Sequence, residues 1–471
     1  MKFRDYLRRN YLLLAIPAAV LAGCNKDNPV PNPNPGGNNN NQIPDSTLAV
    51  NQFIHDNMET YYLWYNQMPD IDYTKQRDPY KYFDSLLYKP TDRWSFITND
   101  YAALEASYQG VEKSMGHSFI LYKYSNSDGV FGIIQFVYPG SPAAIAGIKR
   151  GDLFTAIDGT DLNVNNYQSL LAGQSYTLSL AKLQGNTVVP THDVQLTAEQ
   201  INENPILVYD TLNVNGTIIG YLAYKNFLDN YDDSLAVAFN WLKSAGINKM
   251  VLDLRYNNGG AISAMQYLAS ILAPVTHVNN QDIIITDEYN DILTAYFQSQ
   301  NISNDTRFEN VGVNLNLNDI YVLTGENTAS ASEALIVGLD PYLTMTTLGD
   351  TTVGKYAGAY VIYDTTHKLN WAIQPIVFKY ANSVGYTDFA NGLVPNFLGD
   401  DDLFNPLGSR KEGLLAMAIQ QITGAPVAVT PKSAQIRLGA IPFREYDGNK
   451  PRHSIPLVKN DINLLKQING D

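Results

Sequence analysis

Between about residues 205 and 400, short apolar runs alternate with longer stretches in which apolar residues recur every three or four positions. The first pattern is typical of buried strands and the second of amphipathic helices. Alternation of the two predicts an α/β core. The predicted strands are 217–224, 249–254, 319–324, 345–349 and 372–378, and the predicted helices are 234–245, 261–272 and one that follows Ser332.

The single cysteine, Cys24, follows a basic start and a short apolar run. The apolar run, residues 11–19, is too short to span a bilayer as a helix, and the whole pattern is typical of a secretory signal. Leu21-Ala22-Gly23-Cys24 resembles a bacterial lipobox, which implies removal of residues 1–23 and attachment of lipid to the Cys24 thiol. An ordinary signal peptide and a buried cysteine are the alternatives. A single cysteine excludes intrachain disulfides and cysteine-based zinc sites.

In the remaining sequence, composition and hydrophobic periodicity change several times, and these changes predict domain boundaries. An Asn- and Pro-rich stretch has almost nothing to pack in a core and is expected to be a disordered tether. An aromatic stripe at helical spacing follows it and is interpreted as core packing rather than a cofactor site. The predicted segments are a signal peptide (1–23), a tether (24–46), a helical N-terminal cap (47–105), a β-rich domain (106–200), the α/β core (203–425) and a C-terminal extension (426–471).

Within the β-rich domain, residues 138–152 open a short helix at Ser141-Pro142 and end it at Gly147, before the next strand. This segment resembles a PDZ domain. The resemblance implies that a peptide adds as an extra strand beside a loop that takes its terminal carboxylate. The corresponding loop is Gly116-His117-Ser118-Phe119. His117 and Ser118 replace the usual apolar residue and glycine, which puts carboxylate specificity in doubt and leaves a purely structural module as the alternative.

Three turns of the predicted core carry residues suited to chemistry, and each follows a strand. Residues 253–260 end in two glycines, whose backbone N–H groups can face a bound oxygen. Residues 324–333 form a run of small residues before a helix, which can expose a serine hydroxyl or simply cap the helix. Residues 349–356 approach the phosphate-loop pattern but place Tyr356 where a magnesium-binding hydroxyl is needed, so no nucleotide is expected.

Together with the PDZ-like domain, these turns resemble the C-terminal processing, or tail-specific, serine peptidases over roughly residues 108–400. The resemblance implies a ClpP/crotonase-like core in which Ser330 is the nucleophile and Lys355 the general base. Burial would lower the pKa of the lysine so that it takes the serine proton. The implied oxyanion donors are the backbone N–H groups of Ala331 and of Gly259 or Gly260. Glu333 and Ser332 are expected around this pair, and neither a metal nor another cofactor is needed.

One position departs from the family pattern. Many members place a glutamine four residues after the lysine, whereas this chain has Ala359. Lysine orientation must then come from Ser332, Thr328 or a backbone carbonyl.

The favoured prediction is therefore a lipid-anchored endopeptidase of the cell envelope, on the outer membrane at its periplasmic or surface face, which acts on unstructured or C-terminally recognised proteins and peptides. A catalytically weak peptide-binding lipoprotein on the same fold, and an envelope scaffold or carbohydrate-capturing lipoprotein, are the alternatives. The formal net charge of −14 makes nucleic acid an unfavourable partner.

Overall fold

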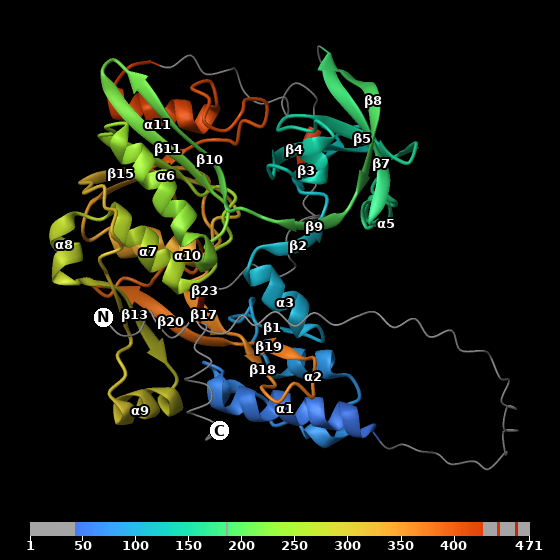
Figure 1. Ribbon diagram of the computed structural model, residues 1–471. Coiled ribbons are helices and arrows are strands. Elements are labelled where there is room, and N and C mark those ends of the chain that lie inside the picture. Colours follow the sequence, from blue (N-terminus) through green and yellow to red (C-terminus); the bar gives the residue numbers. More distant parts are fainter. Residues whose placement is uncertain (1–42, 185–186, 427–439, 443–456, 460–471) are drawn as a thin grey trace, which may run out of the picture. The chain divides into compact units, whose positions relative to one another are not determined.

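The computed structural model describes residues 43–184, 187–426, 440–442 and 457–459 (Figure 1). The predicted signal peptide, Cys24 and nearly all of the predicted tether lie outside these residues. The described part forms one compact unit by its internal contacts. None of its helices is both long enough and apolar enough to cross a bilayer.

The N-terminal cap begins earlier than the sequence predicts. Helix α1 covers Asp45–Tyr61, so the last two residues of the predicted tether are helical. Pro44 at the N-cap has φ −56°, which suits a helix start, and Asp45 places a negative charge in the first turn. The predicted stripe is buried through Val50, Ile54 and Met58. The cap continues through η1 (Tyr65–Gln67), η2 (Tyr73–Lys75), α2 (Pro79–Leu86), β1 (Phe96–Thr98) and α3 (Tyr101–Tyr108).

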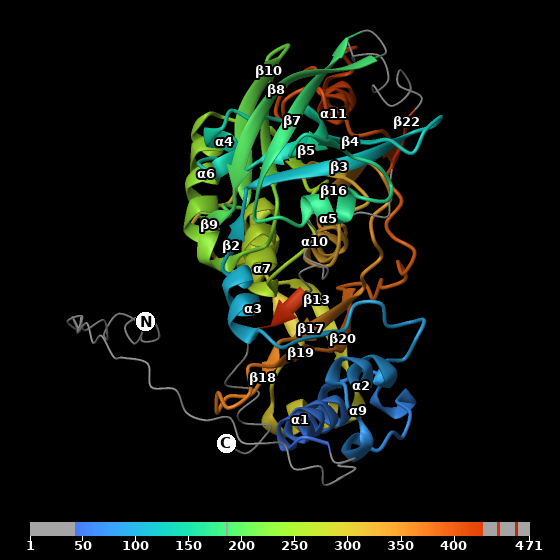
Figure 2. The ribbon, with the colours of Figure 1, turned by 90° about the vertical axis from the view of Figure 1, so that its right-hand side faces the viewer.

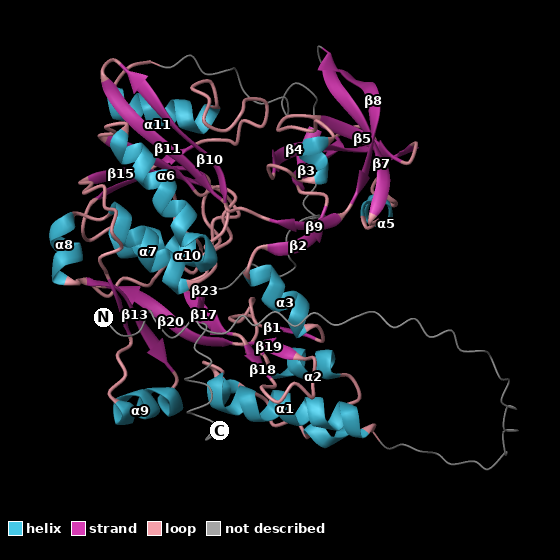
Figure 3. Ribbon diagram, viewed as in Figure 1, coloured by secondary structure: helices cyan, strands magenta, loops and turns pink. Residues whose placement is uncertain are grey.

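The β-rich domain is a curved antiparallel sheet in the order β3-β4-β5-β7-β8, with two short helices beside it (Figure 3). The predicted short helix is α4, which Ser141 caps by accepting from the Ala144 N–H, and Gly147 follows it at φ +82°. The strands are β2 (Val111–Ser114), β3 (His117–Tyr124), β4 (Val130–Val137), β5 (Leu153–Ile157), β6 (Thr160–Asp161), β7 (Ser175–Gln184), β8 (Thr187–Thr197) and β9 (Glu199–Asn202), and the helices are α4 (Pro142–Ile145) and α5 (Tyr167–Leu171).

The α/β core contains a six-stranded sheet in the order β10-β11-β12-β15-β16-β21. All of its pairs are parallel except β10 with β11, so the carboxyl ends of β12, β15 and β16 meet at one edge. The strands are β10 (Ile206–Val214), β11 (Thr217–Tyr224), β12 (Lys249–Asp253), β15 (Asp319–Thr324), β16 (Thr344–Gly349) and β21 (Phe397–Leu398), and the helices are α6 (Asp232–Ser244), α7 (Ile262–Leu272), α10 (Ala331–Leu339) and α11 (Gly413–Thr423).

A second core sheet has the order β14-β13-β20-β17-β23 (Figure 1). Helix α10 packs against α7 and against β13 and β20 of this sheet. Every residue of α10 is buried, so no face of this helix is exposed to solvent. The remaining elements are η3 (Asp229–Tyr231), α8 (Val275–Asn280), β13 (Ile283–Tyr289), α9 (Asp291–Gln300), β14 (Asp305–Arg307), β17 (Ala357–Tyr360), β18 (Ile362–Tyr363), β19 (Ala372–Gln374), β20 (Ile376–Asn382), β22 (Ala440–Pro442) and β23 (Leu457–Lys459).

The predicted start of the helix after Ser332 is wrong by two residues. Helix α10 begins at Ala331, with Ser330 at its N-cap and Ser332 inside its first turn. The backbone N–H of Ser330 donates to the Glu333 carboxylate, which favours a start at this serine. The shift places Ser330, and not Ser332, at the junction of loop and helix.

Candidate active site

Ser330 lies at a sharp bend between β15 and α10. Its backbone has φ 61° and ψ −113°, a conformation that costs energy for any residue with a side chain. The bend sits at the N-terminus of α10, where unpaired backbone N–H groups and the helix dipole favour negative charge. A serine at a sharp turn from a strand into a helix has the position of a nucleophile in many hydrolases.

The glycine turn after β12 lies directly against Ser330. A Cβ atom added to Gly259 would come within 2.8 Å of the Ser330 Cβ and 3.0 Å of the Ala331 nitrogen. Gly259 also has φ +109°, which a residue with a side chain adopts only with strain. The structure therefore brings together two of the turns that the sequence singled out, and only glycine fits at their contact.

Lys355 is completely buried, with 0% exposure, on the loop between β16 and β17. Burial lowers the pKa of its amine to about 7, although the negative charges of Asp92 and Glu333 oppose the shift. Its Nζ atom has no hydrogen-bond partner among the described residues, so it is not bonded to the Ser330 hydroxyl in this arrangement. An amine of this kind is half neutral near pH 7 and can accept a proton.

The Glu333 carboxylate joins the serine turn to the lysine loop. It accepts backbone N–H bonds from Ser330 at 2.8 Å, Gly354 at 2.7 Å and Lys355 at 2.8 Å, and a hydroxyl bond from Thr352. Burial raises the pKa of this carboxyl group, and the four hydrogen bonds act in the opposite direction. Because all four partners are donors, they fit an ionised carboxylate. Glu333 thus positions both loops as well as capping the helix.

Tyr380, in β20, makes a second link between the two loops. Its hydroxyl lies 3.2 Å from the Ser330 carbonyl oxygen and 3.0 Å from the Lys355 carbonyl oxygen, to which it donates. Tyr380 is not among the residues predicted from the sequence. No local motif surrounds it, because it reaches the site only through the antiparallel pairing of β20 with β17.

The two glycines predicted as oxyanion donors differ in their contacts. The Gly259 N–H already donates to the side chain of Asn257 at 2.8 Å, and the Gly259 carbonyl accepts from the Phe227 N–H. Gly260 is the remaining choice beside Ala331, whose N–H is the first in its helix and has no acceptor within that helix. Asn257, within the predicted segment 253–260, fixes this turn through its side chain, which also donates to the Tyr224 carbonyl oxygen at 3.0 Å.

The two hydroxyls considered for orienting the lysine are engaged elsewhere. The Ser332 hydroxyl donates to the Asn257 carbonyl oxygen at 3.1 Å, and the Thr328 hydroxyl donates to the Leu254 carbonyl oxygen at 2.8 Å. Neither is a hydrogen-bond partner of Lys355 here, nor is any described backbone carbonyl. In this arrangement the amine is therefore buried without a hydrogen bond from the described residues, and the charges of Asp92 and Glu333 act on it through space.

Three family models match the chain: the peptidase S41 N-terminal domain over residues 49–96, a PDZ domain over 133–182 and peptidase family S41 over 218–397. This chain carries the N-terminal and core domains of peptidase family S41, with a PDZ domain between them. The PDZ resemblance and the family inferred from the sequence are both confirmed.

Similar proteins agree with this assignment. A carboxyl-terminal-processing protease of Picosynechococcus is 30% identical over 46% of this chain and 49% of its own length. Its counterpart in Synechocystis is 26% identical over 63% of this chain and 66% of its own length. The chain thus matches between half and two thirds of these relatives. The crystal structure of a putative S41 protease from Bacteroides fragilis has a TM-score of 0.68 and 27% identity, covering 79% of this chain and 97% of that one.

In this S41 chain, the PDZ domain has a cavity of about 310 Å³ at the predicted peptide loop. His117, Ser118 and Phe119 line the cavity, whereas Gly116 does not, and a Cβ atom added to Gly116 would come within 2.1 Å of the Ser141 Cβ. Burial lowers the pKa of His117 to about 4, so its ring is neutral at pH 7 and offers no charge to a carboxylate.

Other charged groups do reach the cavity. Glu112, Glu203 and Lys225 also line it. Burial, assisted by Glu112, raises the pKa of Glu203 to about 7. The cavity therefore has mixed charge rather than a purely cationic end.

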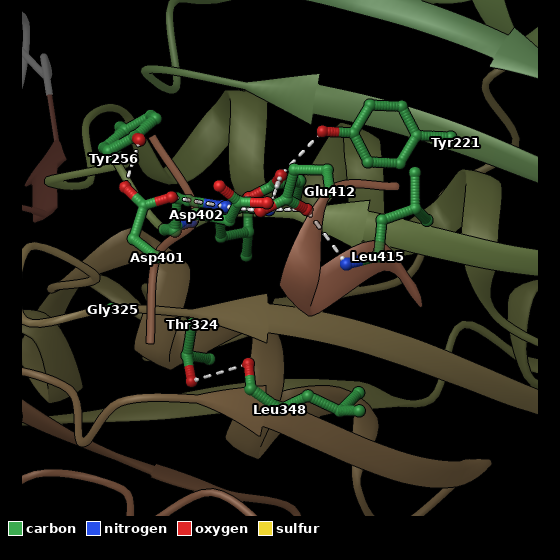
Figure 4. Close-up of polar contacts among 12 residues, drawn as sticks. Tyr221, Tyr256, Thr324, Gly325, Leu348, Asp401, Asp402, Glu412 and Leu415 are labelled. Carbon is green, nitrogen blue, oxygen red and sulfur yellow. Dashed lines mark hydrogen bonds and ion pairs between the residues drawn. The ribbon is translucent and has the colours of Figure 1, made fainter. Parts of the chain in front are cut away.

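A buried ionic network lies beside the glycine turn of the S41 core (Figure 4). The Arg255 guanidinium binds both oxygens of Glu412, at 2.6 and 2.9 Å, and also contacts Asp253 and Asp401. Burial alone would raise the pKa of Asp401, but its arginine partners hold it at about 2. Arg150 of the PDZ domain is the second of these partners, at 2.7 Å. The network therefore ties the PDZ domain to the segment that precedes Gly259.

Within the part of the chain that the structure describes, no group of three or more His, Cys, Asp or Glu side chains is arranged to hold a metal ion.

Proposed function

We propose that this chain is a serine endopeptidase that cleaves unstructured or C-terminally recognised polypeptides, with Ser330 as nucleophile and Lys355 as general base. The observation that carries the proposal is the buried lysine. Its pKa of about 7 makes it a base at neutral pH, and Glu333 and Tyr380 hold its loop against the serine turn.

In this proposal the neutral Lys355 amine takes the proton of the Ser330 hydroxyl while Oγ attacks the carbonyl carbon of the scissile bond. Negative charge then develops on the carbonyl oxygen, close to the start of α10, where the Ala331 N–H and a glycine N–H stabilise it. The protonated lysine returns its proton to the leaving amine. Water then hydrolyses the acyl-enzyme, with the same amine as base, and regenerates Ser330.

The arrangement described here is a closed one. Ser330 and Lys355 each have 0% exposure, and Nζ makes no hydrogen bond to the serine. A substrate carbonyl can reach Oγ only after the surrounding elements move, and the serine–lysine bond then forms in the opened site. The same observation favours the alternative, a peptide-binding protein on this fold that cleaves poorly.

The decisive experiment is digestion of casein by the chain lacking residues 1–42, beside its Ser330→Ala variant, with the products identified by mass spectrometry. We expect fragments only from the unaltered protein. Lys355→Ala and Lys355→Arg are expected to be inactive as well, because a guanidinium is not a base near neutrality. EDTA should change nothing. Absence of fragments from a folded, unaltered protein would favour the peptide-binding alternative.

We further propose that a lipid on Cys24 anchors the protein in the cell envelope. The support is the sequence Leu21-Ala22-Gly23-Cys24 after a basic and apolar start. Expression of the full chain with Cys24→Ser, followed by separation of membranes, tests it. The variant is expected in the soluble fraction and the unaltered chain in the membrane fraction. Membrane retention of both would contradict the anchor.

A further inference from the structure

Two short strands of the C-terminal extension add to the edges of two different sheets. Strand β22 pairs antiparallel with β3 of the PDZ domain (Figure 2), and β23 pairs parallel with β17 of the core (Figure 1). Both are three residues long and lie beyond α11, the last helix described. The proposed chemistry uses neither strand.

The edge that β22 occupies is the one to which a peptide would add. Strand β4 lies on the other side of β3, and the cavity at the predicted peptide loop lies at the start of β3. The pairs are Ala440 with Tyr124, Ile441 with Lys123 and Pro442 with Tyr122. From its N-terminal to its C-terminal residue, β22 therefore runs toward the predicted peptide loop. A peptide that added to β3 and placed its C-terminus in the loop would run in the same direction.

The second strand covers the edge next to the proposed base. Strand β17 begins at Ala357, two residues after Lys355. One edge of β17 pairs with β20. The other edge pairs with β23 through Leu457, Val458 and Lys459. An extended polypeptide that approached Lys355 along this edge would have to displace β23.

We propose that strands β22 and β23 of the C-terminal extension are intramolecular ligands of this chain that occupy the two strand-adding edges and compete with polypeptide substrates. The proposal rests on the proposed peptidase function, whose site it regulates. It agrees with the closed site, in which both Ser330 and Lys355 are unexposed. A tethered strand is present at high effective concentration, so even a weak one blocks an edge effectively.

The hydrogen-bond pattern of β22 identifies the variant that tests this. Residue pairs of an antiparallel ladder alternate between those that exchange two backbone bonds and those that exchange none. Pro442 has no N–H, so Pro442 and Tyr122 cannot exchange two backbone hydrogen bonds. By the alternation, the neighbouring pair, Ile441 and Lys123, is the one that exchanges two bonds. Ile441→Pro removes the donor of this pair, whereas Ile441→Ala shortens the same side chain and keeps the donor.

The first test compares casein cleavage by the full chain with Ile441→Pro and with Ile441→Ala. We expect the proline variant to have a KM at least about threefold lower at unchanged kcat, because an intramolecular competitor raises the apparent Kd to the intrinsic Kd divided by the fraction of molecules whose edge is free. Val458→Pro against Val458→Ala tests the edge of β17 in the same way. The proposal would be overturned if the proline and alanine variants had equal melting temperatures and equal KM values. A lower melting temperature of the proline variants without a change in KM would also overturn it, since the strands would then only cover edges.

The second test does not depend on cleavage. A fluorescein-labelled peptide of residues 430–446 is titrated into the full chain with Ser330→Ala, combined with either Ile441→Pro or Ile441→Ala, and anisotropy is recorded. We expect binding to the proline form to be at least about threefold tighter, because its β3 edge is vacant. Equal binding would overturn the proposal. If no form of the chain cleaves casein, the peptidase assignment fails, but this measurement still decides whether the extension occupies the edge.

Discussion

At the scale of single residues, Lys355 is the side chain that the fold alters most. A lysine in water has a pKa of about 10.4, and burial brings the pKa of this one to about 7. If the neutral amine is the base, kcat/KM must rise with pH along a limb with its midpoint near 7. Measurement of kcat/KM for casein-derived peptides between pH 5 and 9 checks this. A flat profile, or one governed by a group near pH 4, would contradict the role of Lys355.

The same lysine is expected to reduce the stability of the fold. Between about pH 7 and 10.5 its amine is protonated in the unfolded chain and largely neutral in the folded one, so the free energy of unfolding rises with pH across this window. Lys355→Met keeps a long unbranched side chain and removes the amine. We expect the variant to be more stable below pH 7 by about 2–4 kcal/mol, with the gain vanishing by about pH 10.5. Urea unfolding at pH 6, 8 and 10 tests this, and a gain that does not depend on pH would refute it.

At the scale of elements, the site depends on how α10 is joined to the loop before β17. Glu333 provides this join with four accepted hydrogen bonds. Glu333→Gln retains the shape but turns an NH₂ group toward two of these donors, which costs about 1–3 kcal/mol. We expect lower stability, a lower kcat and faster amide hydrogen exchange at residues 330, 354 and 355.

The charge of Glu333 gives a second signature that lost packing would not produce. Its negative charge opposes the fall in the Lys355 pKa, so Glu333→Gln should move the rising limb of the pH profile to lower pH. Glu326→Gln, at an exposed position in the loop that precedes α10, is the matched control. A lower kcat with an unmoved pH limb would show that Glu333 acts through structure alone.

Much of the element arrangement could be predicted because its signals are local. The buried strands before each turn are continuous apolar runs, and their parallel neighbours bring residues 253–260, 324–333 and 349–356 to one sheet edge. The start of α10 was misplaced because Ser330 and Ser332 are equally good N-cap residues by type. Tyr380 was missed because it acts through contacts set by sheet pairing, and nothing in its neighbours in the sequence distinguishes it.

At the scale of the whole described unit, the sequence could not reveal what joins the PDZ domain to the core. Arg150 stands in a turn of the PDZ motif, where a surface cation is the ordinary expectation. In the structure its side chain is only 7% exposed. Its partners in the core are 106 to 255 residues away in sequence, a separation that no local pattern encodes.

The contacts of Arg150 predict how the unit unfolds when they are lost. Its guanidinium donates to the Gln135 carbonyl oxygen within the PDZ domain, and to the Tyr256 hydroxyl, Asp401 and two backbone carbonyls in the core. Arg150→Leu leaves these acceptors buried without their donor, at a cost of about 3 kcal/mol. The cost falls on the junction, so we expect the PDZ domain to melt separately from the core, as two calorimetric transitions where the unaltered chain shows one. Lys149→Leu, which removes the neighbouring exposed cation, should leave a single transition. A single, merely lowered transition in Arg150→Leu would mean that other contacts hold the two domains together, and that Arg150 stabilises the junction without deciding its cooperativity.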